Sequence, residues 1–256
     1  MRPKILLFAI IIIGMSINMN AQDQSIEKRF PFKIGNLRLK YNYITFNQIK
    51  NTEIVTDTLE IYNEWDYPMK IGFVNVPDFM TCFAQPETLK SKEEGILIVT
   101  MNATKRNDYG FLYNRLTINT NDSVNKQKGL NVSVYIKEDF SHLTPDQLQN
   151  APKVVLNSER FNFGTVKDGD MVKYSFIISN EGNEDLIIRK TKASCGCTAS
   201  KPEKTLLKKG ETSKINITFN TTNRPGKQHK TVTVITNDPK KADITLHIEG
   251  TVEKKQ

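Results

Sequence analysis

The sequence predicts an all-β protein made of two tandem antiparallel β-sandwiches. Two observations carry this prediction: apolar and polar residues alternate at period two in many short runs, and a pattern of whole-domain length occurs twice. The composition, with 38% hydrophobic and 25% charged residues, is that of a globular protein and argues against long disorder or a multi-pass membrane protein. Helical spacing of apolar residues is nearly absent.

The first 21 residues have the features of a secretory signal peptide. Arg2 and Lys4 form a short positive head, and residues 5–13 are an unbroken apolar run. Ala21 is a suitable residue for signal peptidase to cut after. The apolar run is nine residues long. A helix that spans a membrane needs about 20 residues. We therefore expect an exported protein with no membrane span after processing. The alternative is an uncleaved N-terminal anchor.

A long repeat indicates two domains of similar size. Three pairs of anchor points recur at spacings of 117, 116 and, more loosely, 115 residues: Asn63 and Asn180, the Thr-Asn-Asp runs at 120–122 and 236–238, and Gly95 and Gly210. Solenoid repeats are only about 20–50 residues long, so this period is that of a whole domain. The predicted organisation is a signal peptide at 1–21, a first domain at 22–140, a linker at 141–153 and a second domain at 154–256.

Alternating runs identify the strands of both copies. The clearest lie at residues 130–136 of the first copy and at residues 172–178, 215–219 and 244–248 of the second. Turn sequences such as NEGNED, KKGE, NRPGK and NDPKKAD separate the runs. About six or seven short, half-exposed strands in about 100 residues are typical of an immunoglobulin-like β-sandwich. In the linker, Thr144 is placed to cap one helical turn, with Pro145 at its first position and Pro152 ending it.

The positive charge does not indicate a nucleic-acid site. The net charge is +8, and removal of the signal peptide lowers it to +6. The basic residues are spread along the chain with acids nearby, as on a solvated lysine-rich surface. An exported protein also meets little nucleic acid. Weak attraction to acidic glycans or lipid headgroups remains open.

Residues 158–253 resemble a family of exported bacterial domains, the domain of unknown function number 1573. The resemblance rests on the Ser-Cys-Gly-Cys-Thr turn at 194–198, the KKGETSK turn, and the closing VITND and IEGTV runs. It implies a sandwich akin to major-sperm-protein and Hydin-type domains, which mostly act as binding or scaffolding modules, and it favours a Gram-negative periplasm over the cell surface or secretion. The tandem repeat and the lack of a catalytic set lead us to expect a protein partner in an envelope assembly. The resemblance itself implies no activity. The first copy departs from the pattern, because the single Cys82 stands where the paired cysteines would align.

The turn formed by Ser194, Cys195, Gly196, Cys197 and Thr198 is the candidate functional site. Three interpretations stay open: a structural turn, a redox-active or partner-reactive thiol pair, and a site for a soft metal ion such as Cu(I). A bridge between the two cysteines would need a tight turn at Gly196, because an extended chain holds their Cα atoms about 7 Å apart. Zinc is not expected, since His142, His229 and His247 are neither near this motif nor paired with one another.

Other candidates for chemistry are few. The single Cys82, flanked by apolar residues, suits a small core residue better than a nucleophile. Trp65 and Tyr67 either close one end of a sandwich or contact a sugar or protein partner. No serine elbow or glycine-rich phosphate loop is present in the sequence. We therefore expect a protein that binds a protein partner and is not an enzyme, with no cofactor, no metal and no catalytic residues, the alternative being a thiol-active protein that uses Cys195 and Cys197.

Overall fold

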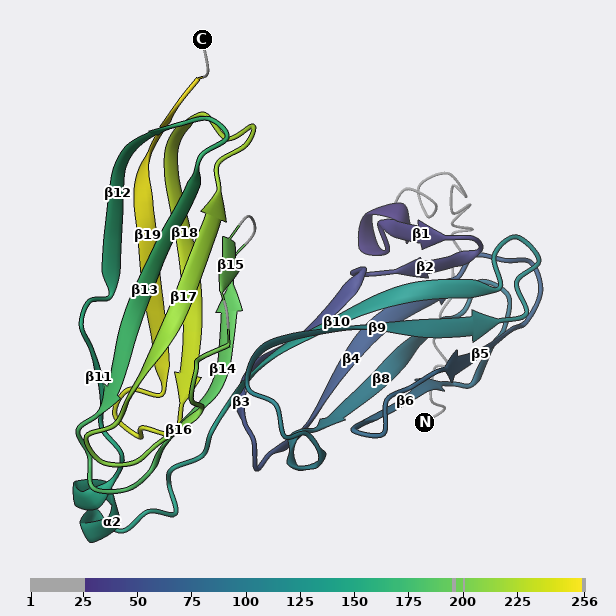
Figure 1. Ribbon diagram of the computed structural model, residues 1–256. Helices are drawn as coiled ribbons and strands as arrows, with labels where there is room; N and C mark the ends of the chain where they lie inside the picture. The colour runs from purple at the N-terminus through teal and green to yellow at the C-terminus, as the bar shows by residue number, and fades with distance from the viewer. Residues whose placement is uncertain (1–25, 195–196, 200, 255–256) are drawn as a thin grey trace, which may run out of the picture.

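The computed structural model describes residues 26–194, 197–199 and 201–254. The expected signal peptide at 1–21 lies outside these residues. The chain is built almost entirely of strands, which form two sandwiches that meet at an angle (Figure 1). The predicted all-β sandwich architecture is thus confirmed.

The first sandwich consists of two five-stranded sheets, ordered β1-β2-β4-β8-β6 and β3-β10-β9-β5-β7. Its strands are β1 (Phe32–Ile34), β2 (Leu37–Leu39), β3 (Tyr43–Lys50), β4 (Ile54–Asn63), β5 (Met69–Val74), β6 (Met80–Gln85), β7 (Thr88–Leu89), β8 (Glu94–Asn102), β9 (Gly110–Thr120) and β10 (Gln127–Lys137). A short 3-10 helix, η1 (Ala103–Lys105), joins β8 to β9.

The second sandwich has sheets ordered β11-β13-β17-β15 and β12-β19-β18-β14-β16. Its strands are β11 (Val154–Leu156), β12 (Arg160–Lys167), β13 (Met171–Asn180), β14 (Leu186–Ala193), β15 (Cys197–Ala199), β16 (Leu206–Leu207), β17 (Thr212–Asn220), β18 (Gly226–Thr236) and β19 (Asp243–Glu253). Before β11, helix α2 (Pro145–Asn150) begins at Thr144, whose hydroxyl accepts the amide of Gln147.

One strand pair in each sandwich is parallel, which the sequence did not predict. β3 pairs with β10 and β12 pairs with β19 in parallel, while the other described pairs are antiparallel. In each copy the strand just before the parallel one lies in the other sheet: β2 precedes β3, and β11 precedes β12. The parallel strand, β3 or β12, then pairs with the last strand of its copy, β10 or β19.

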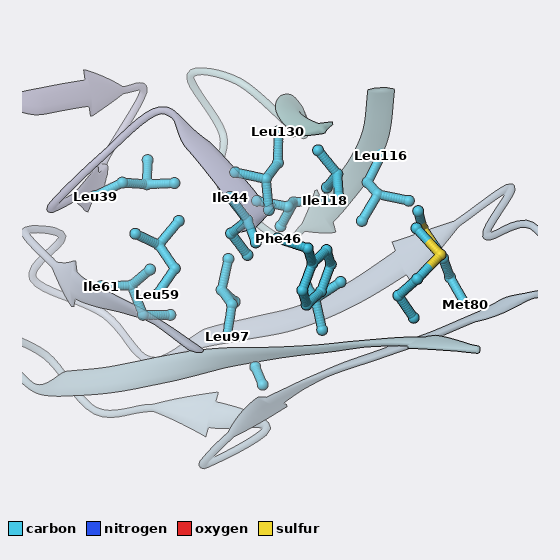
Figure 2. Packing of buried hydrophobic residues seen from close by; sticks show 14 of the residues in the cluster. Leu39, Ile44, Phe46, Leu59, Ile61, Met80, Leu97, Leu116, Ile118 and Leu130 are labelled. Carbon is cyan, nitrogen blue, oxygen red and sulfur yellow. The ribbon is translucent and has the colours of Figure 1, made fainter. Parts of the chain in front are cut away.

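Each sandwich has its own hydrophobic core, filled by the inward positions of the alternating runs. Figure 2 shows the first core, in which Phe46 and Leu97 lie among residues of both sheets. In the second core, Phe176, Ile215 and Leu246 are fully buried, each from a run that the sequence had identified. The period-two prediction therefore gave the correct buried face.

The sequence repeat has a structural cause in a buried asparagine. Asn63 and Asn180 are fully buried, and each donates its amide to the carbonyl oxygen four residues later, at 2.9 and 2.8 Å. Each also donates to the carbonyl oxygen 27 residues later, at 2.8 and 2.9 Å. Each accepts the main-chain amide two residues later, at 3.0 and 2.9 Å. Asparagine is needed because it supplies both donors and an acceptor to buried main chain.

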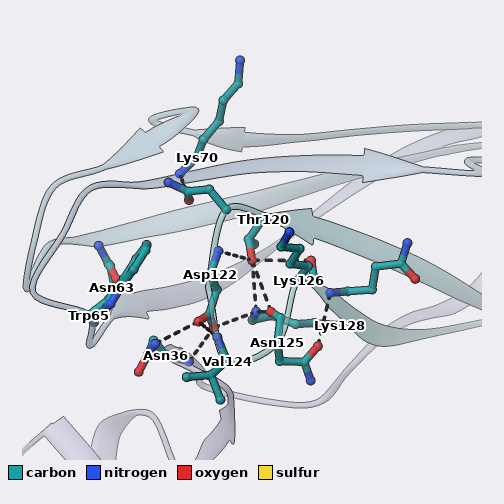
Figure 3. A network of polar contacts seen from close by, with 12 residues as sticks. Asn36, Asn63, Trp65, Lys70, Thr120, Asp122, Val124, Asn125, Lys126 and Lys128 are labelled. Atoms are coloured by element: carbon teal, nitrogen blue, oxygen red, sulfur yellow. Dashed lines mark hydrogen bonds and ion pairs between the residues drawn. The ribbon is translucent and has the colours of Figure 1, made fainter.

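The Thr-Asn-Asp runs form a second matching feature. Asp122 accepts the main-chain amide of Asn36 at 2.7 Å, and Asp238 accepts that of Val154 at 2.9 Å. Each carboxylate thereby joins the turn before the last strand of its sandwich to one of the first strands, just before β2 in the first copy and at β11 in the second. Unlike Asp238, Asp122 also lies 3.0 Å from the ammonium of Lys128, and both side chains are fully buried (Figure 3). Burial alone would raise the pKa of Asp122, but these hydrogen bonds and Lys128 lower it to about 2.

The loose match of Gly95 with Gly210 was wrong. Gly210 has a φ of +79° and donates its amide to the carbonyl oxygen of Asn180 at 2.7 Å. The equivalent donor to Asn63 is Lys92, at 3.0 Å, whose φ is +59°. Gly95 lies within β8. Glycine adopts a positive φ without strain, but lysine adopts it here, so matching by residue type led to the wrong position.

Candidate functional site

The candidate turn lies where the chain passes from one sheet of the second sandwich to the other. β14 ends at Ala193, and β15 begins at Cys197 and pairs with β17 of the opposite sheet. Ser194 closes the end of β14: its amide donates to the carbonyl oxygen of Thr231 at 2.8 Å, and its hydroxyl accepts the Thr231 amide at 3.0 Å. Cys195 and Gly196 lie outside the described residues, and of Cys197 and Thr198 only the strand pairing is described.

Cys82 lies in β6 opposite Val99 and packs against the first core. Burial raises the pKa of its thiol to about 11. The thiol is therefore protonated at neutral pH, which removes the thiolate that nucleophilic chemistry needs. This environment suits a small core residue.

Trp65 and Tyr67 lie together at one end of the first sandwich. Their rings make an edge-to-face contact with centroids 5.2 Å apart. Trp65 packs against the first core, and its amide donates to the side chain of Asn63 at 3.0 Å. Tyr67 is 63% exposed. The tryptophan thus closes the sandwich end, and the tyrosine is left open to solvent.

A larger group of aromatic side chains, which the sequence had not singled out, covers the outer side of β3, β10 and β9. This aromatic face is defined by Tyr41, Tyr43, Phe111, Tyr113 and Tyr135. Of these, Phe111 and Tyr113 are 49% and 58% exposed, and Tyr41 and Tyr43 are 48% and 50% exposed. The rings of Tyr41 and Tyr43 lie 5.9 Å apart.

Strand register gives the composition of the aromatic face. The outward positions align in three rows: Arg115 with Asn131 and Tyr43, Tyr113 with Ser133 and Thr45, and Phe111 with Tyr135 and Gln48. None of these nine residues is lysine, aspartate or glutamate. Aromatic residues and arginine are enriched at the centres of protein interfaces, where lysine and the acids are depleted. The signal was present in the sequence, because aromatic residues occupy the outward positions of two alternating runs.

Ion pairs join the first sandwich to the second beside the aromatic face. Arg189 donates two guanidinium hydrogen bonds to Glu138, one of them at 2.6 Å. The ammonium of Lys190 lies 2.7 Å from the carboxylate of Asp108. Burial opposes ionisation of Asp108, but Lys190 holds its pKa below the usual value. Both pairs are partly buried and therefore less screened than pairs on an open surface.

A close apolar contact, a cation–π contact and a hydrogen bond also join the two sandwiches. Gly110, the first residue of β9, is buried against Ile235 of β18, and a Cβ atom built at Gly110 would lie 2.4 Å from the Cδ1 atom of Ile235. The ammonium of Lys192 lies 5.3 Å from the ring centroid of Phe111, and Tyr135 donates its hydroxyl to Asp243 at 2.8 Å. The aromatic face therefore continues onto the second sandwich, close to the end of β14, where the candidate turn begins. Figure 1 shows β14 and β15 on the side that faces the first sandwich.

Metal-ligating residues are sparse across the described ranges. Residues 26–194, 197–199 and 201–254 contain no group of three or more His, Cys, Asp or Glu side chains that could hold a metal ion. The expectation that the histidines are unpaired was wrong, however. His229 and His247 lie on neighbouring strands, with Nε2 of the first 2.9 Å from Nδ1 of the second. The sequence separation of 18 residues hid a pairing that the β18–β19 hairpin creates.

Comparison with known families concerns the second sandwich. Residues 154–252 match the model of a family described as a protein of unknown function, DUF1573. The second sandwich thus matches the DUF1573 family model. The match confirms the resemblance noted for residues 158–253 and extends over the candidate turn. No curated protein matches the chain.

Solved structures extend the similarity to both sandwiches. The chain is similar to a protein of unknown function from Porphyromonas gingivalis W83, with a TM-score of 0.63 and 18% identity over 85% of this chain and 100% of that one. This likeness shows a shared fold that extends over both sandwiches. A PapD-like domain of human CEP192 gives a TM-score of 0.33 at 14% identity, over 47% of this chain and 99% of that one, which is too low to support an argument.

None of the helices in the part of the chain that the structure describes is long and apolar enough to cross a membrane.

Proposed function

We propose that this protein is an exported, non-catalytic binding protein of the bacterial cell envelope, and that its aromatic face holds another protein. The observation that carries the proposal is the aromatic face itself. Three rows of aromatic, arginine and neutral polar side chains lie on the outer side of one sheet, and its four most exposed rings are between 48% and 58% exposed. Large exposed aromatic surfaces of this kind are unfavourable unless a partner covers them.

A protein partner suits this surface better than a small molecule. Small ligands are held in concave pockets, whereas the outer side of a sheet is open and broad. Tyrosine and phenylalanine bury much area at little cost in conformational entropy, and the neutral Asn, Ser and Thr side chains between them supply hydrogen bonds. The junction supports this role, because a fixed angle between the sandwiches presents the aromatic face and the end of β14 to one partner.

Export is the second part of the proposal, and the apolar run at residues 5–13 supports it. Cell fractionation should place the protein in the periplasm. Mass analysis of its N-terminus should find a chain that begins at Gln22. A cytoplasmic chain that begins at Met1 would contradict this part of the proposal and leave the binding surface untouched.

A matched pair of photo-cross-linking positions tests the binding surface in cells. Tyr113 and Ile54 are similarly exposed, at 58% and 62%, and lie on opposite sheets of the same sandwich. A photoreactive residue at position 113 should give one discrete adduct, and the same residue at position 54 should give none. The mass of the adduct separates a different protein from a second copy of this chain. Equal labelling at the two positions, or none at 113, would refute the proposal.

The absence of catalysis is tested on the purified protein. We expect no turnover of ester, peptide, glycoside or disulfide substrates above the rate given by heat-unfolded protein. Turnover at an ordinary enzymatic rate, about 1 s⁻¹ or more, would contradict this part of the proposal.

A further inference from the structure

Two histidines form a pair on the outer side of the second sandwich. His229 lies on β18 and His247 on β19, two residue pairs apart in the antiparallel register. Nε2 of His229 is 2.9 Å from Nδ1 of His247, and the two rings are inclined by 25° with centroids 5.2 Å apart. His229 is exposed and His247 is half-buried, so the pair is open to solvent ions.

We propose that His229 and His247 together bind Cu²⁺ through these two facing nitrogens. Two nitrogens that lie about 2.0 Å from a metal at a right angle are about 2.9 Å apart, whereas a tetrahedral angle requires about 3.3 Å. The observed 2.9 Å is the length of the hydrogen bond between the metal-free rings, and it matches the separation of adjacent corners in a square-planar site, the geometry of Cu²⁺ and Ni²⁺. It does not fit tetrahedral Zn²⁺ without spreading the rings.

The identity of the metal follows from the small number of protein ligands. A site with two imidazoles and otherwise water binds weakly, and the divalent first-row metals bind nitrogen sites in an order that peaks at Cu²⁺. We expect Cu²⁺ to bind most tightly, then Ni²⁺, then Zn²⁺. In the free pair, one of the two facing nitrogens carries the shared proton. Metal binding moves that proton to the other nitrogen of the same ring, so a neutral pair binds the metal without a net loss of protons.

The side chains around the pair carry charges of both signs, and Lys227 lines the hollow beside His229. Glu249 lies opposite His229 across the strand pair, and Arg160 of β12 lies opposite His247. These two side chains are 3.7 Å apart and compensate one another. A bulge in β12 between Asn162 and Thr165 leaves a hollow beside His229 and Glu249. The hollow gives water, or a carboxylate that reorients, access to the remaining metal positions.

The test uses the exported chain and Cu²⁺ itself. The chain has only three histidines, so its imidazole signals are resolved in a ¹H–¹⁵N spectrum. Substoichiometric Cu²⁺ should broaden the signals of His229 and His247 together and spare His142 in the linker. This measurement needs no substituted protein to fold for its outcome to count. Broadening of only one of the pair, or broadening of all three at equal Cu²⁺, would overturn the proposal.

Affinity measurements on three matched variants give the second test. His229→Thr and His247→Thr each remove one ligand and keep a residue that favours strands. Because the second imidazole binds intramolecularly, each should weaken Cu²⁺ binding about 100-fold, while His142→Thr leaves it unchanged. Circular dichroism checks that each variant is folded. Unchanged affinity in either strand variant would overturn the two-nitrogen site, and an equal loss in His142→Thr would show that binding is nonspecific.

Discussion

Replacing Gly110 with alanine probes the packing between the two sandwiches. Gly110 has a φ of +77°, and a Cβ atom there would lie 2.4 Å from Cδ1 of Ile235, a residue that is 4% exposed. Gly210 is the matched control, because its φ is +79° and nothing lies within 4 Å of the corresponding Cβ position. The two substitutions therefore share the backbone strain and differ in the contact.

The expected magnitudes follow from these two effects. Alanine in the left-handed region costs about 1–2 kcal/mol, and forcing extra atoms into a packed site costs about 1–3 kcal/mol more. Gly110→Ala should thus lower the free energy of unfolding by about 2–5 kcal/mol and Gly210→Ala by about 1–2 kcal/mol. Shortening Ile235 makes room for the new methyl group. In an Ile235→Ala background, Gly110→Ala should therefore cost only the strain, about 1–2 kcal/mol.

Urea unfolding of the four proteins in this double-mutant cycle, with the Gly210→Ala control beside them, supplies the numbers. The single tryptophan, Trp65, reports on the first sandwich by fluorescence, and circular dichroism reports on both. If Gly110→Ala costs the same with Ile235 present and with Ile235→Ala, the two residues do not touch in solution. The reasoning about a fixed junction would then be refuted.

Three further outcomes follow from single side chains. Lys128→Met should lower the free energy of unfolding by about 3–5 kcal/mol in urea titrations, because it leaves the buried carboxylate of Asp122 uncompensated. The control Lys126→Met, at an exposed position, should change the free energy of unfolding by less than about 0.5 kcal/mol. The pKa of folded Asp122 is about 2, below its unfolded value of 3.8, so ionised Asp122 stabilises the fold above about pH 4. This stabilisation is lost as the pH falls toward 2. Over that range the wild type should therefore lose stability more steeply than Asp122→Asn. Because its thiol pKa is about 11, Cys82 should react with iodoacetamide at pH 8 about 100-fold more slowly in the folded chain than in urea. The mass of the peptide that contains Cys82 measures the extent of reaction. Equal rates in the two conditions would contradict the assigned burial.

The fold was predictable because its signals are local and repeated. Alternation alone placed Ile215 and Phe176 in the core, because apolar and polar residues alternate along a strand that has one buried and one solvent-exposed face. The recurrence of Asn63 at Asn180 was equally informative, because only asparagine makes that set of hydrogen bonds to buried main chain. The parallel β3–β10 pair left no such trace, since parallel and antiparallel pairing depend on where the chain crosses between sheets.

The functional surfaces were harder to predict because they depend on register between strands. The sequence drew attention to Trp65, which the structure places against the core, and missed Phe111 and Tyr113, which become one surface only when β9 pairs with β10. The pairing of His229 with His247 likewise depends on the hairpin. Cysteine pairs such as Cys195 and Cys197 stand out in a sequence, whereas neighbours across strands do not.

The central claim is that the aromatic face binds a protein partner, and the most direct measurement is the affinity of the purified cross-linked partner for two variants. Tyr113→Ala removes an exposed ring from the aromatic face, and Ile54→Ala removes a similarly exposed side chain from the opposite sheet. Calorimetry should find binding about 30-fold weaker for Tyr113→Ala, equal to about 2 kcal/mol, and unchanged for Ile54→Ala. Equal affinities for the two variants would contradict the account.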